Sequence, residues 1–434
     1  MGRPLLTWVL QSLASISPVR TVVVVGHGAE AVQELIPEGV ESAVQREQLG
    51  TGHATAVGLE ALGGLADDDL VVVVYGDMPL MTPRLFSDLV SASPDGPVLT
   101  TVDTPRPTGY GRIIRDADGL VVDVVEEKDC TEEQRAITEI NVGLYAVGAG
   151  ALAGAVRSLS AANAQGEYYL TDIVSMLAAA GSAWRVVPAS IEEVAGVNSQ
   201  DQLAEAGAAL RRQINAGLME SGVWMQDPDR TYIDADVVVE PGARIYPGVH
   251  LEGSTVIGAD AVVGPDVLAI DSEIGAGSVV IYSVLRGAIV GSDCHVGPFA
   301  SLRKGTVLGD GSKAGTFVET KNTTLGAGAK APHLSYLGDA TIGDRTNIGA
   351  GTITCNYDGF EKHPTVIGED AFIGSDTMLV APLRIGDRAL TGAGSVISRD
   401  VADDALAVER TEQKEIPGYA QRRAERRANK ASED

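Results

Sequence analysis

Cysteine is scarce in this sequence, and so are aromatic residues and long apolar runs. The three cysteines, Cys130, Cys294 and Cys355, are widely separated and form no pair with metal-ligand spacing. We therefore expect reduced thiols in a cytosolic protein. Aromatic residues make up 4% of the chain, which predicts cores of aliphatic side chains. The sequence shows no run of about 18 apolar residues and no charged-then-apolar leader, so it predicts a soluble, cytoplasmic protein without a membrane span.

Positive charge is also in short supply. Lysine and arginine together number 33 against 59 aspartates and glutamates, which gives a net charge of -26. A general nucleic-acid binder needs a basic face, so this balance argues against that class. Small anionic substrates are not excluded, because a few local arginines and lysines can hold a phosphate.

Aliphatic residues recur at a spacing of six between about Ile233 and Val396. Many are followed directly by glycine, as at Ile257-Gly258 and Ile385-Gly386. This period fits neither an amphipathic helix nor an ordinary strand, and it indicates a solenoid. We expect each glycine to adopt a turn angle that other residues resist. Stacked coils bury a continuous aliphatic ladder, so the pattern predicts a parallel β-helix.

The six-residue ladder is interrupted in places. Leu308 and Leu325 are 17 residues apart, and Ile348 and Ile367 are 19 apart, so neither gap is a multiple of six. Around these interruptions lie the most polar segments, at 317–321, 332–336 and 356–359. Because loops on a rigid scaffold often carry function, we expect functional residues there. A similar interruption near Ile274 carries no such chemistry.

The first two hundred residues alternate short aliphatic runs with helical stretches. This alternation predicts an α/β domain with a mostly parallel sheet. Ligands of such sheets bind beyond the carboxyl ends of the strands, and Tyr75-Gly76-Asp77 follows the most apolar run. The expected strands are 21–25, 70–75 and 98–102, and the expected helices are 4–13, 53–62, 82–90 and 171–180.

Ser199-Gln200-Asp201-Gln202 resembles a capping box and predicts the start of a connecting helix. We expect an α/β domain at 1–201, a helical linker at 202–229, a β-helix domain at 230–411 and a tail at 412–434. The tail carries several arginines. A solvated helical end explains them, and so does docking of an anionic ligand or partner.

Asp77 and Asn198 are candidate metal ligands. Each also has an ordinary explanation, Asp77 as a turn residue and Asn198 as a residue ahead of a helix cap. Together their oxygens would suit Mg²⁺, which takes few protein ligands and completes its shell with substrate phosphates.

His333 is one of only six histidines in the sequence. A single histidine is usually structural, but this one lies in a ladder interruption between Lys321 and Tyr336, with Arg303 one coil earlier. The group offers a base near neutral pH and two cations for a phosphate. Both interpretations stand at this point.

Longer strings carry a resemblance over nearly the whole chain. The strings are Gln48-Leu49-Gly50-Thr51-Gly52-His53-Ala54, Tyr110-Gly111-Arg112-Ile113, Glu167-Tyr168-Tyr169-Leu170-Thr171-Asp172, His333-Leu334-Ser335-Tyr336-Leu337-Gly338-Asp339, and Asn347 to Thr352 continuing to Asn356-Tyr357-Asp358-Gly359. With them the sequence resembles the bifunctional bacterial enzymes that are both N-acetylglucosamine-1-phosphate uridyltransferase and glucosamine-1-phosphate N-acetyltransferase. Hexads alone are shared by many acyltransferases, so these strings are the specific part.

The resemblance implies roles for individual residues of the α/β domain. Asp77 and Asn198 match Mg²⁺ ligands, and Asn198 also matches a substrate contact. The positions that match residues holding the uracil and the sugar are Gln45, Gly50, Thr51, Gly111, Glu126 and Asn141.

In the β-helix domain the resemblance implies that His333 is the general base. Sugar-phosphate contacts match Arg303, Lys321, Tyr336 and Asn347. Positions lining the acetyl-CoA site match Ala350, Asn356, Tyr357, Ser375, Ala393 and Arg410. The family's β-helix is left-handed and forms homotrimers, with acetyl-transfer sites between subunits.

The implied enzyme transfers an acetyl group from acetyl-CoA to glucosamine 1-phosphate. It then transfers a uridylyl group from UTP, with Mg²⁺, to N-acetylglucosamine 1-phosphate. Two rival interpretations are a different sugar nucleotidyltransferase with a regulatory hexad tail, and a non-catalytic solenoid for assembly. Lys321, His333 and Asn356-Tyr357 argue against the first rival, because a regulatory tail needs no acyl-transfer set. A purely structural helix should show uniform coils, whereas this one concentrates its polar interruptions in one region.

The beginning of the chain departs from the family pattern. Met1-Gly2-Arg3-Pro4 passes straight into a predicted helix, whereas the family begins earlier, with a strand, a glycine-rich loop and a lysine. Such a loop receives the triphosphate. If Met1 is the true start, we expect an acetyltransferase with little or no uridyltransferase activity; if the gene begins upstream, we expect both activities.

Overall fold

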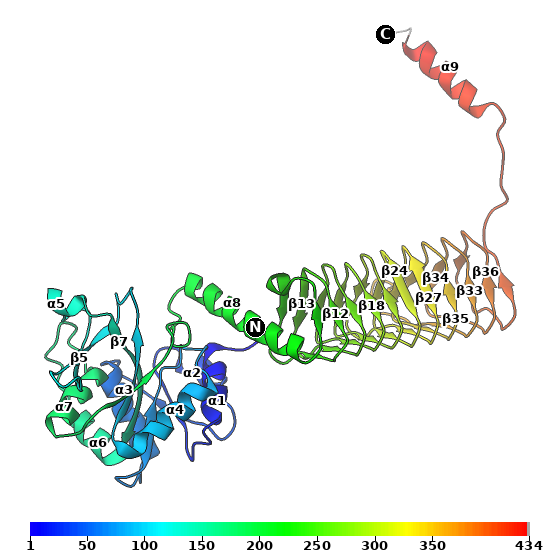
Figure 1. Cartoon of the computed structure of the whole chain (residues 1–434). Helices are drawn as coiled ribbons and strands as arrows, with labels where there is room; N and C mark the ends of the chain where they lie inside the picture. The colour runs from blue at the N-terminus through cyan, green and yellow to red at the C-terminus, as the bar shows by residue number, and fades with distance from the viewer. Residues whose placement is uncertain (432–434) are drawn as a thin grey trace. The chain divides into compact units, whose positions relative to one another are not determined.

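The computed structural model describes residues 1–431; the end of the expected tail, 432–434, lies outside the described residues. The chain forms two compact units that divide between Leu210 and Arg211, within helix α8 (Gln200–Glu220) (Figure 1). Among the described residues, no helix combines the length and apolar character needed to cross a membrane.

The first unit is α/β, as predicted, and its main sheet is mixed. The strand order is β6-β5-β7-β4-β8, and β3 also pairs with β7. The central strand β7 runs antiparallel to β3, β4 and β5, while β4 with β8, and β1 with β2 in a separate ladder, are parallel. The elements are α1 (Leu5–Ala14), β1 (Val22–Val25), α2 (Ala29–Gln33), β2 (Glu41–Val44), α3 (Thr51–Leu62), β3 (Leu70–Val73), α4 (Pro83–Ala92), η1 (Ser93–Asp95), β4 (Val98–Asp103), β5 (Gly111–Arg115), β6 (Val121–Val125), α5 (Glu132–Arg135), β7 (Glu139–Gly148), α6 (Ala149–Arg157), η2 (Leu170–Asp172), α7 (Ile173–Ala179) and β8 (Arg185–Pro188).

Residues of β7 divide between two cores on opposite faces of this sheet. Val142 and Leu144 pack with residues of α1 and α4 on one face, whereas Tyr145 and Val147 pack with residues of α6 and α7 on the other. Each strand and helix expected from the sequence is present, with bounds that differ by a few residues. The sheet is therefore covered on both faces, which leaves its strand ends as the place for a ligand.

Helix α8 begins where the capping sequence predicts. The Ser199 hydroxyl accepts from the backbone N–H of Gln202 at 3.4 Å, and the Gln202 side chain accepts from the Asn198 backbone N–H at 2.8 Å. Ala206 and Leu210 pack in the first unit, and the later residues of the helix pack on the core of the second.

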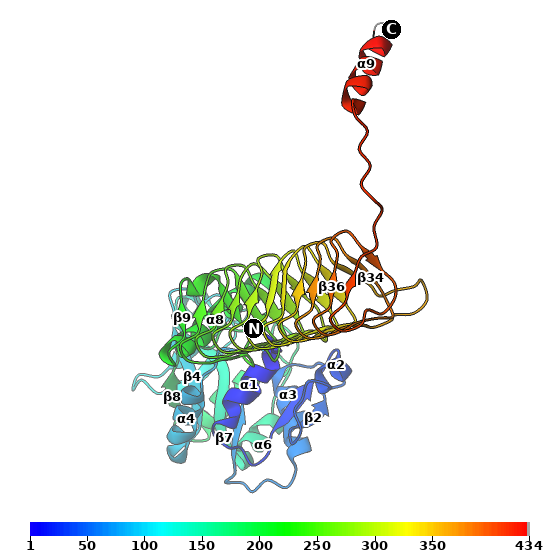
Figure 2. The same ribbon diagram turned by 90° about the vertical axis from the view of Figure 1, so that its right-hand side faces the viewer.

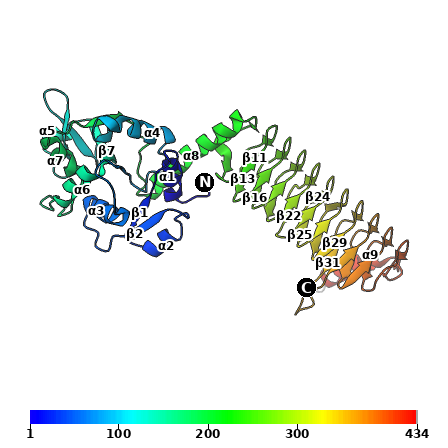
Figure 3. The ribbon, with the colours of Figure 1, turned by 90° about the horizontal axis from the view of Figure 1, so that it is seen from below.

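The second unit is a left-handed parallel β-helix, as the resemblance implied. Within the described residues its strands form three parallel sheets of ten, nine and eleven strands, here called faces A, B and C. The chain visits A, B and C in turn, so each coil has an A–B, a B–C and a C–A corner. Figure 2 shows the coils of the second unit stacked one behind another. In Figure 3 the face A strands β13, β16, β22 and β25 follow one another along the axis of the helix.

The strands of the three faces are short. Face A comprises β10 (Thr231–Ile233), β13 (Val249–Glu252), β16 (Leu268–Ile270), β19 (Val284–Arg286), β22 (Ser301–Leu302), β25 (Glu319–Lys321), β28 (Tyr336–Gly338), β31 (Ile353–Cys355), β34 (Met378–Val380) and β37 (Val396–Ile397). Face B comprises β11 (Val238–Val239), β14 (Val256–Ile257), β17 (Glu273–Ile274), β20 (Ile289–Val290), β23 (Val307–Leu308), β26 (Thr324–Leu325), β29 (Ala340–Ile342), β32 (Thr365–Ile367) and β35 (Leu383–Ile385). Face C comprises β9 (Trp224–Met225), β12 (Arg244–Ile245), β15 (Val262–Val263), β18 (Val279–Val280), β21 (His295–Val296), β24 (Lys313–Thr316), β27 (Lys330–His333), β30 (Asn347–Ile348), β33 (Phe372–Ile373), β36 (Leu390–Thr391) and β38 (Leu406–Ala407). Outside the three faces lie η3 (Pro228–Arg230) and α9 (Tyr419–Ala431).

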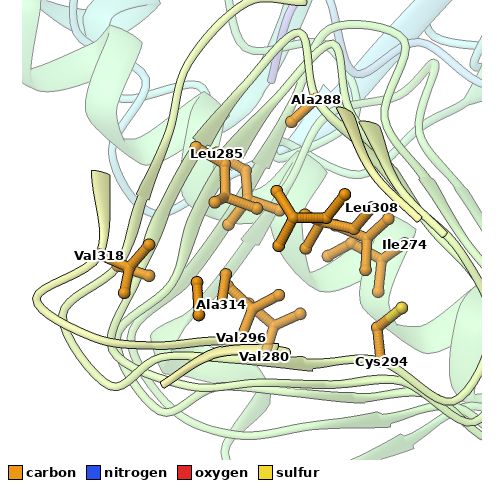
Figure 4. Packing of buried hydrophobic residues seen from close by; sticks show 14 of the residues in the cluster. Ile274, Val280, Leu285, Ala288, Cys294, Val296, Leu308, Ala314 and Val318 are labelled. Atoms are coloured by element: carbon orange, nitrogen blue, oxygen red, sulfur yellow. The ribbon is translucent and has the colours of Figure 1, made fainter. Parts of the chain in front are cut away.

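The aliphatic ladder predicted from the six-residue period forms the core of this unit. Ile274, Val280, Leu285 and Leu308 are fully or almost fully buried, and Figure 4 shows these side chains converging inside the coils. Leu308 and Leu325 are partners on adjacent coils, so the 17-residue gap leaves the ladder intact. The larger interruption is a loop between β31 and β32, within the long coil from Ile342 to its partner Ile367.

The glycines after the inward aliphatics serve a different purpose from the one expected. Gly258 and Gly343 do not have positive φ angles. A Cβ on Gly258 would lie 2.6 Å from the backbone nitrogen of Ala276, and one on Gly343 would lie 2.4 Å from the carbonyl carbon of Gly368. These positions exclude side chains because adjacent coils approach closely. Positive φ angles occur two residues further on, as at Asp260 and Arg345.

Candidate functional site

The first group of candidate residues surrounds the start of helix α3. The Gln45 side chain donates to the Gly50 carbonyl at 3.1 Å, and the Thr51 hydroxyl accepts from the Leu170 backbone N–H at 3.1 Å. Gly50 has a φ of 106°, and a Cβ there would lie 2.7 Å from the Tyr168 carbonyl oxygen. Glycine is therefore needed at this position for both its backbone angle and its contact with the neighbouring segment.

Gly111, Glu126 and Asn141 form a second group on neighbouring strands. Gly111 and Asn141 are partners in the β5–β7 ladder. A Cβ on Gly111 would lie 3.6 Å from a Glu126 carboxylate oxygen, and this carboxylate accepts from the Thr171 hydroxyl at 3.1 Å. Burial raises the pKa of Glu126, against the opposing effect of the Thr171 hydrogen bond. The Asn141 side-chain oxygen is buried without a partner, as expected of a group that awaits a ligand.

Asp77 and Asn198 lie on either side of Gly196. A Cβ on Gly196 would lie 3.3 Å from Asp77 Oδ2 and 3.6 Å from Asn198 Nδ2. The Val197 backbone N–H donates to the Asp77 carbonyl at 3.0 Å and ties the two segments together. Burial raises the pKa of the Asp77 carboxyl. One carboxylate and one amide suit Mg²⁺ that is otherwise held by water and phosphate oxygens.

Tyr75 joins this site, although we predicted no role for its side chain from the sequence. Burial, and then the charge of Glu126, raises the pKa of Tyr75 to about 12, while a hydrogen bond with Thr51 opposes the rise. The Tyr75 ring lies against Gly143, which has a φ of 76° and where any Cβ would overlap the ring. The glycine two residues after Asn141 was the sequence feature that could have indicated this contact.

In the β-helix unit, Asp339 gathers several side chains at the A–B corner. It accepts from Asn322 Nδ2 at 2.9 Å and from Asn356 Nδ2 at 2.5 Å, and its oxygen lies 3.3 Å from Lys321 Nζ. Burial raises the pKa of Asp339, but the hydrogen bonds from Asn322, Asn356 and Lys321 outweigh it and hold the pKa below its ordinary value. Lys321 and Asn356 are therefore fixed side by side.

Tyr336 and Arg303 belong to the same corner region. A Cβ on Gly338 would lie 2.5 Å from the Tyr336 hydroxyl and 2.7 Å from Asn356 Nδ2, so these two groups converge. Arg303, one coil before Lys321, pairs with Glu319 at 3.0 Å. Both partners of this pair are about half exposed, and such pairs exchange readily for a ligand.

Lys362 is a site residue that the sequence interpretation missed. The loop between β31 and β32 returns it beside Lys321, whose hydrogen bond and positive charge lower the pKa of Lys362. Tyr357 and Lys362 are bridge partners in this loop. The 19-residue gap in the ladder indicated the loop, but not the direction in which it returns.

His333 and most residues matched to acetyl-CoA contacts lie at a different corner. His333 ends β27 and begins the C–A corner, where it is exposed. Backbone hydrogen bonds join the same corner of successive coils, from Gly351 to Leu334, from Asp376 to Ala350 and from Gly394 to Ser375. The candidates on this line are Ala350, Ser375 and Ala393, and the Arg410 guanidinium donates to the Ala393 carbonyl at 2.9 Å.

Within one chain, the residues around Lys321 at the A–B corner lie apart from those around His333 at the C–A corner. Gly338, beside Lys321 in the ladder, follows His333 by five residues, which contain the C–A corner at Leu334 and then strand β28 across face A. The sugar-phosphate candidate Asn347 lies on face C, opposite Lys330. The acetyl-CoA candidate Tyr357 lies in the loop between β31 and β32, where its hydroxyl donates to the Gly359 carbonyl at 2.7 Å. Lys321, Tyr336 and Arg303 thus lie at one edge of face A together with the acetyl-CoA candidate Asn356. His333 lies at the other edge with Ala350, Ser375 and Ala393.

Two family models match this chain, one in each of its two units. Residues 1–171 match the model of the MobA-like NTP transferase domain, and residues 364–399 match the bacterial transferase hexapeptide model. The Bifunctional protein GlmU of Alkalilimnicola ehrlichii is 47% identical over 421 residues, which cover 96% of this chain and 90% of the relative. Those of Streptomyces coelicolor (46%, covering 100% of this chain and 91% of the relative) and Desulfitobacterium hafniense (43%, covering 96% and 92%) are similar. The chain belongs to the GlmU family of bifunctional proteins.

Proposed function

We propose that the two units divide the synthesis of UDP-N-acetylglucosamine between them. The β-helix unit acetylates glucosamine 1-phosphate from acetyl-CoA, and the α/β unit then transfers uridylyl from UTP to N-acetylglucosamine 1-phosphate. The observation that carries the first step is the cluster of Lys321, Lys362 and Arg303 beside Tyr336 and Asn356. The enzyme acts in the cytoplasm and supplies peptidoglycan synthesis and cell-wall growth.

Acetyl transfer needs a neutral amine that attacks the thioester carbonyl. Lys321, Lys362 and Arg303 hold the sugar phosphate, because charge-assisted hydrogen bonds to phosphate are the strong ones. This contact orients the amine, and orientation contributes several kcal/mol to such reactions. His333 takes the amine proton as the C–N bond forms, and the C–S bond of the thioester then breaks so that coenzyme A leaves as the thiol. The acetyl-CoA chain lies along the corner that holds Ala350, Ser375, Ala393 and Arg410.

Uridylyl transfer requires the sugar phosphate oxygen to attack the α-phosphorus of UTP, which breaks the bond between the α- and β-phosphates and releases pyrophosphate. Asp77 and Asn198 hold Mg²⁺, which when bound offsets the charge of the phosphates. Glu126 and Asn141 bind the sugar, since the Asn141 side-chain oxygen has no protein partner. Gln45, Gly50 and Thr51 receive the uracil at the start of α3. The protein contributes position and charge, without a covalent intermediate.

The separation of the two corners is the reason to propose a homotrimer. A substrate phosphate at the A–B corner of one copy needs a base within hydrogen-bond reach, and His333 of its own chain lies across face A. A neighbouring copy that presents its C–A corner would bring its His333 and its acetyl-CoA positions to that phosphate. Three-fold closure then repeats the site around the axis.

The C–A corner carries an exposed apolar stripe suited to such a contact. Tyr282, Phe299, Phe317 and Leu334 are 41%, 55%, 56% and 59% exposed. The Phe299 ring centroid lies 5.7 Å from that of Tyr282 and 5.5 Å from that of Phe317. All four residues have positive φ angles between 46° and 58°, which are costly for bulky side chains. Exposed apolar surface and backbone strain on the line that contains His333 favour an interface there.

Mixed oligomers test the shared site. His333→Ala and Lys321→Ala each inactivate acetyl transfer in a homogeneous oligomer. If base and phosphate site come from different copies, refolding the two variants together restores sites in which each copy supplies its intact residue. Random mixing then gives about a quarter of the wild-type rate. Mixtures as inactive as the separate variants would show that each chain builds its own site.

The two activities are tested on the purified chain. Coenzyme A release from acetyl-CoA and glucosamine 1-phosphate measures the first, and pyrophosphate release from UTP, Mg²⁺ and N-acetylglucosamine 1-phosphate measures the second. A nucleotidyltransferase with a structural tail would release pyrophosphate without coenzyme A turnover. An assembly solenoid would do neither.

A further inference from the structure

The side chain of His53 contacts Gln45, and no role has yet been assigned to it. His53 lies in the first turn of α3 and is half buried. Its Nδ1 is 3.1 Å from Nε2 of Gln45, and the same Gln45 nitrogen is 3.1 Å from the Gly50 carbonyl oxygen. One amide nitrogen thus has two partners, one from the backbone and one from an imidazole.

The donor and acceptor properties of Gln45, Gly50 and His53 determine where the hydrogens of these contacts lie. A backbone carbonyl oxygen only accepts hydrogen bonds, so the Gln45 atom facing Gly50 must be the NH₂ group. An amide NH₂ only donates, so the His53 Nδ1 beside it must be unprotonated. The neutral imidazole therefore carries its proton on Nε2. Both hydrogens of the Gln45 nitrogen are used, and its Oε1, a pure acceptor, is the atom left for a ligand.

We infer that His53 is a positioning residue that holds Gln45 as a hydrogen-bond acceptor and thereby selects uracil over cytosine. This inference rests on the proposed binding of the UTP base at the start of α3. The uracil ring carries a donor, N3–H, between two carbonyl acceptors, whereas cytosine presents an unprotonated N3 beside an amino group. An acceptor fixed at Gln45 Oε1 bonds the uracil N3–H and repels the cytosine N3 lone pair.

Without an acceptor at His53, the Gln45 amide is held by Gly50 alone. A single contact leaves one amide hydrogen free, and rotation of the side chain can then present NH₂ to the base. The Gln45 NH₂ group, once it faces the base, can donate a hydrogen bond to cytosine N3 about as well as to uracil O4. The discrimination between the two bases is thus expected to depend on His53, although His53 itself does not contact the base.

Two substitutions of matched shape separate this role from simple packing. His53→Asn places an amide oxygen where Nδ1 lies, because the two side chains branch at the same atom. His53→Leu keeps the branch but offers no acceptor. For each variant of the full chain, kcat/KM is measured with UTP and with CTP by pyrophosphate release, and Kd is measured for both nucleotides with Mg²⁺. Acetyl transfer in the same sample serves as the internal control.

We expect His53→Leu to narrow the preference for UTP over CTP by about tenfold or more, the usual worth of one fixed hydrogen bond plus one avoided repulsion. His53→Asn should retain most of the preference. An unchanged preference in His53→Leu, or equal losses in both variants, would overturn the inference. A wild-type protein that binds and turns over neither nucleotide would instead reject the proposed function.

A spectroscopic measurement keeps the inference open to refutation even if His53→Leu does not fold. Nitrogen-15 NMR of histidine-labelled protein reports which ring nitrogen carries the proton, and the spectrum of His53→Asn assigns the resonance. We expect a neutral His53 ring protonated at Nε2. A ring protonated at Nδ1 could not accept from Gln45, and the inference would fall.

Discussion

The α/β unit and the β-helix unit position their candidate residues in different ways. In the α/β unit, residues as distant in sequence as Asp77 and Asn198 meet around one glycine. In the β-helix, position along the chain becomes position along the axis, so each corner carries a line of residues from successive coils. A sheet with helices on both faces can close a pocket within one chain. A solenoid presents rows of residues on its outer surface, which is why we propose that a second copy completes the acetyl-transfer site.

Removing the general base His333 should cause the largest loss of activity, and the loss should be confined to the acetyl transfer of the β-helix unit. We expect His333→Ala to lower acetyl transfer about a hundredfold or more, the usual loss for a general base. Uridylyl transfer should not change, because no residue of the α/β site lies on the β-helix. The two assays on one preparation check this. A variant with near-normal acetyl transfer at neutral pH would show that His333 is not the base.

The difference between the two units also predicts that acetyl transfer by the β-helix unit depends on the oligomer, whereas uridylyl transfer by the α/β unit does not. Phe317→Asn removes exposed apolar surface while keeping a residue that tolerates a positive φ. We expect it to weaken the oligomer and to reduce acetyl transfer about tenfold or more at low protein concentration, since each buried aromatic is worth about 2 kcal/mol. Light scattering and the coenzyme A assay measure the two effects.

Ile289→Ser is the matched control for this change. Ile289 is 45% exposed but lies on face B, away from the stripe. The Ile289→Ser substitution should leave the oligomer and both activities unchanged. If Phe317→Asn behaved like Ile289→Ser, the stripe would not be the interface.

A smaller effect is expected from loosening the A–B corner. Asp339→Asn keeps the shape of the side chain but removes the charge that fixes Lys321 and Asn356. We expect the KM for glucosamine 1-phosphate to rise about tenfold, because a hydrogen bond to a charged group is worth about 1.5 kcal/mol or more. Steady-state kinetics measure this, with Asp310→Asn at the B–C corner as the control. Equal KM values for the two variants would contradict a role for Asp339 in binding.

The smallest effect concerns stability in the α/β unit. Burial raises the pKa of Glu126 above its value in an unfolded chain. The folded protein therefore binds that proton more tightly, and stability falls as pH rises from the unfolded pKa through the raised folded pKa. Glu126→Gln removes this loss and keeps a partner for Thr171. We expect it to stabilise the unit by about 1 kcal/mol at pH 8.

Calorimetry at pH 4 and pH 8 checks the Glu126 prediction. The variant should gain over the wild type at pH 8 and should show little difference at pH 4, where both states are largely protonated. Uridylyl transfer should decrease, since the carboxylate is placed for the sugar. Equal melting temperatures at both pH values would show that burial of Glu126 costs the fold nothing.

Local patterns in the sequence were enough to predict an α/β unit followed by a parallel β-helix, whereas most of the candidate residues were implied by the family resemblance. The six-residue period predicted the aliphatic ladder that Ile274 and Leu308 form, because burial of one side chain per strand leaves a direct trace in the sequence. The helices and strands of the first unit were predicted for a similar reason. The reason given for Gly258 was wrong, since the close approach of a neighbouring coil has no local signature.

Only the tertiary structure decided which residues meet. The sequence placed His333 between Lys321 and Tyr336, but the chain turns a corner at His333 and puts the base across face A from the cations. Lys362 joins Lys321 because a loop returns it there, and Tyr75 reaches Thr51 because Gly143 leaves room for its ring. Residue types and periods determine which surfaces are buried. Contacts between distant residues depend on how coils, strands and loops are packed, and a single sequence does not encode that packing locally.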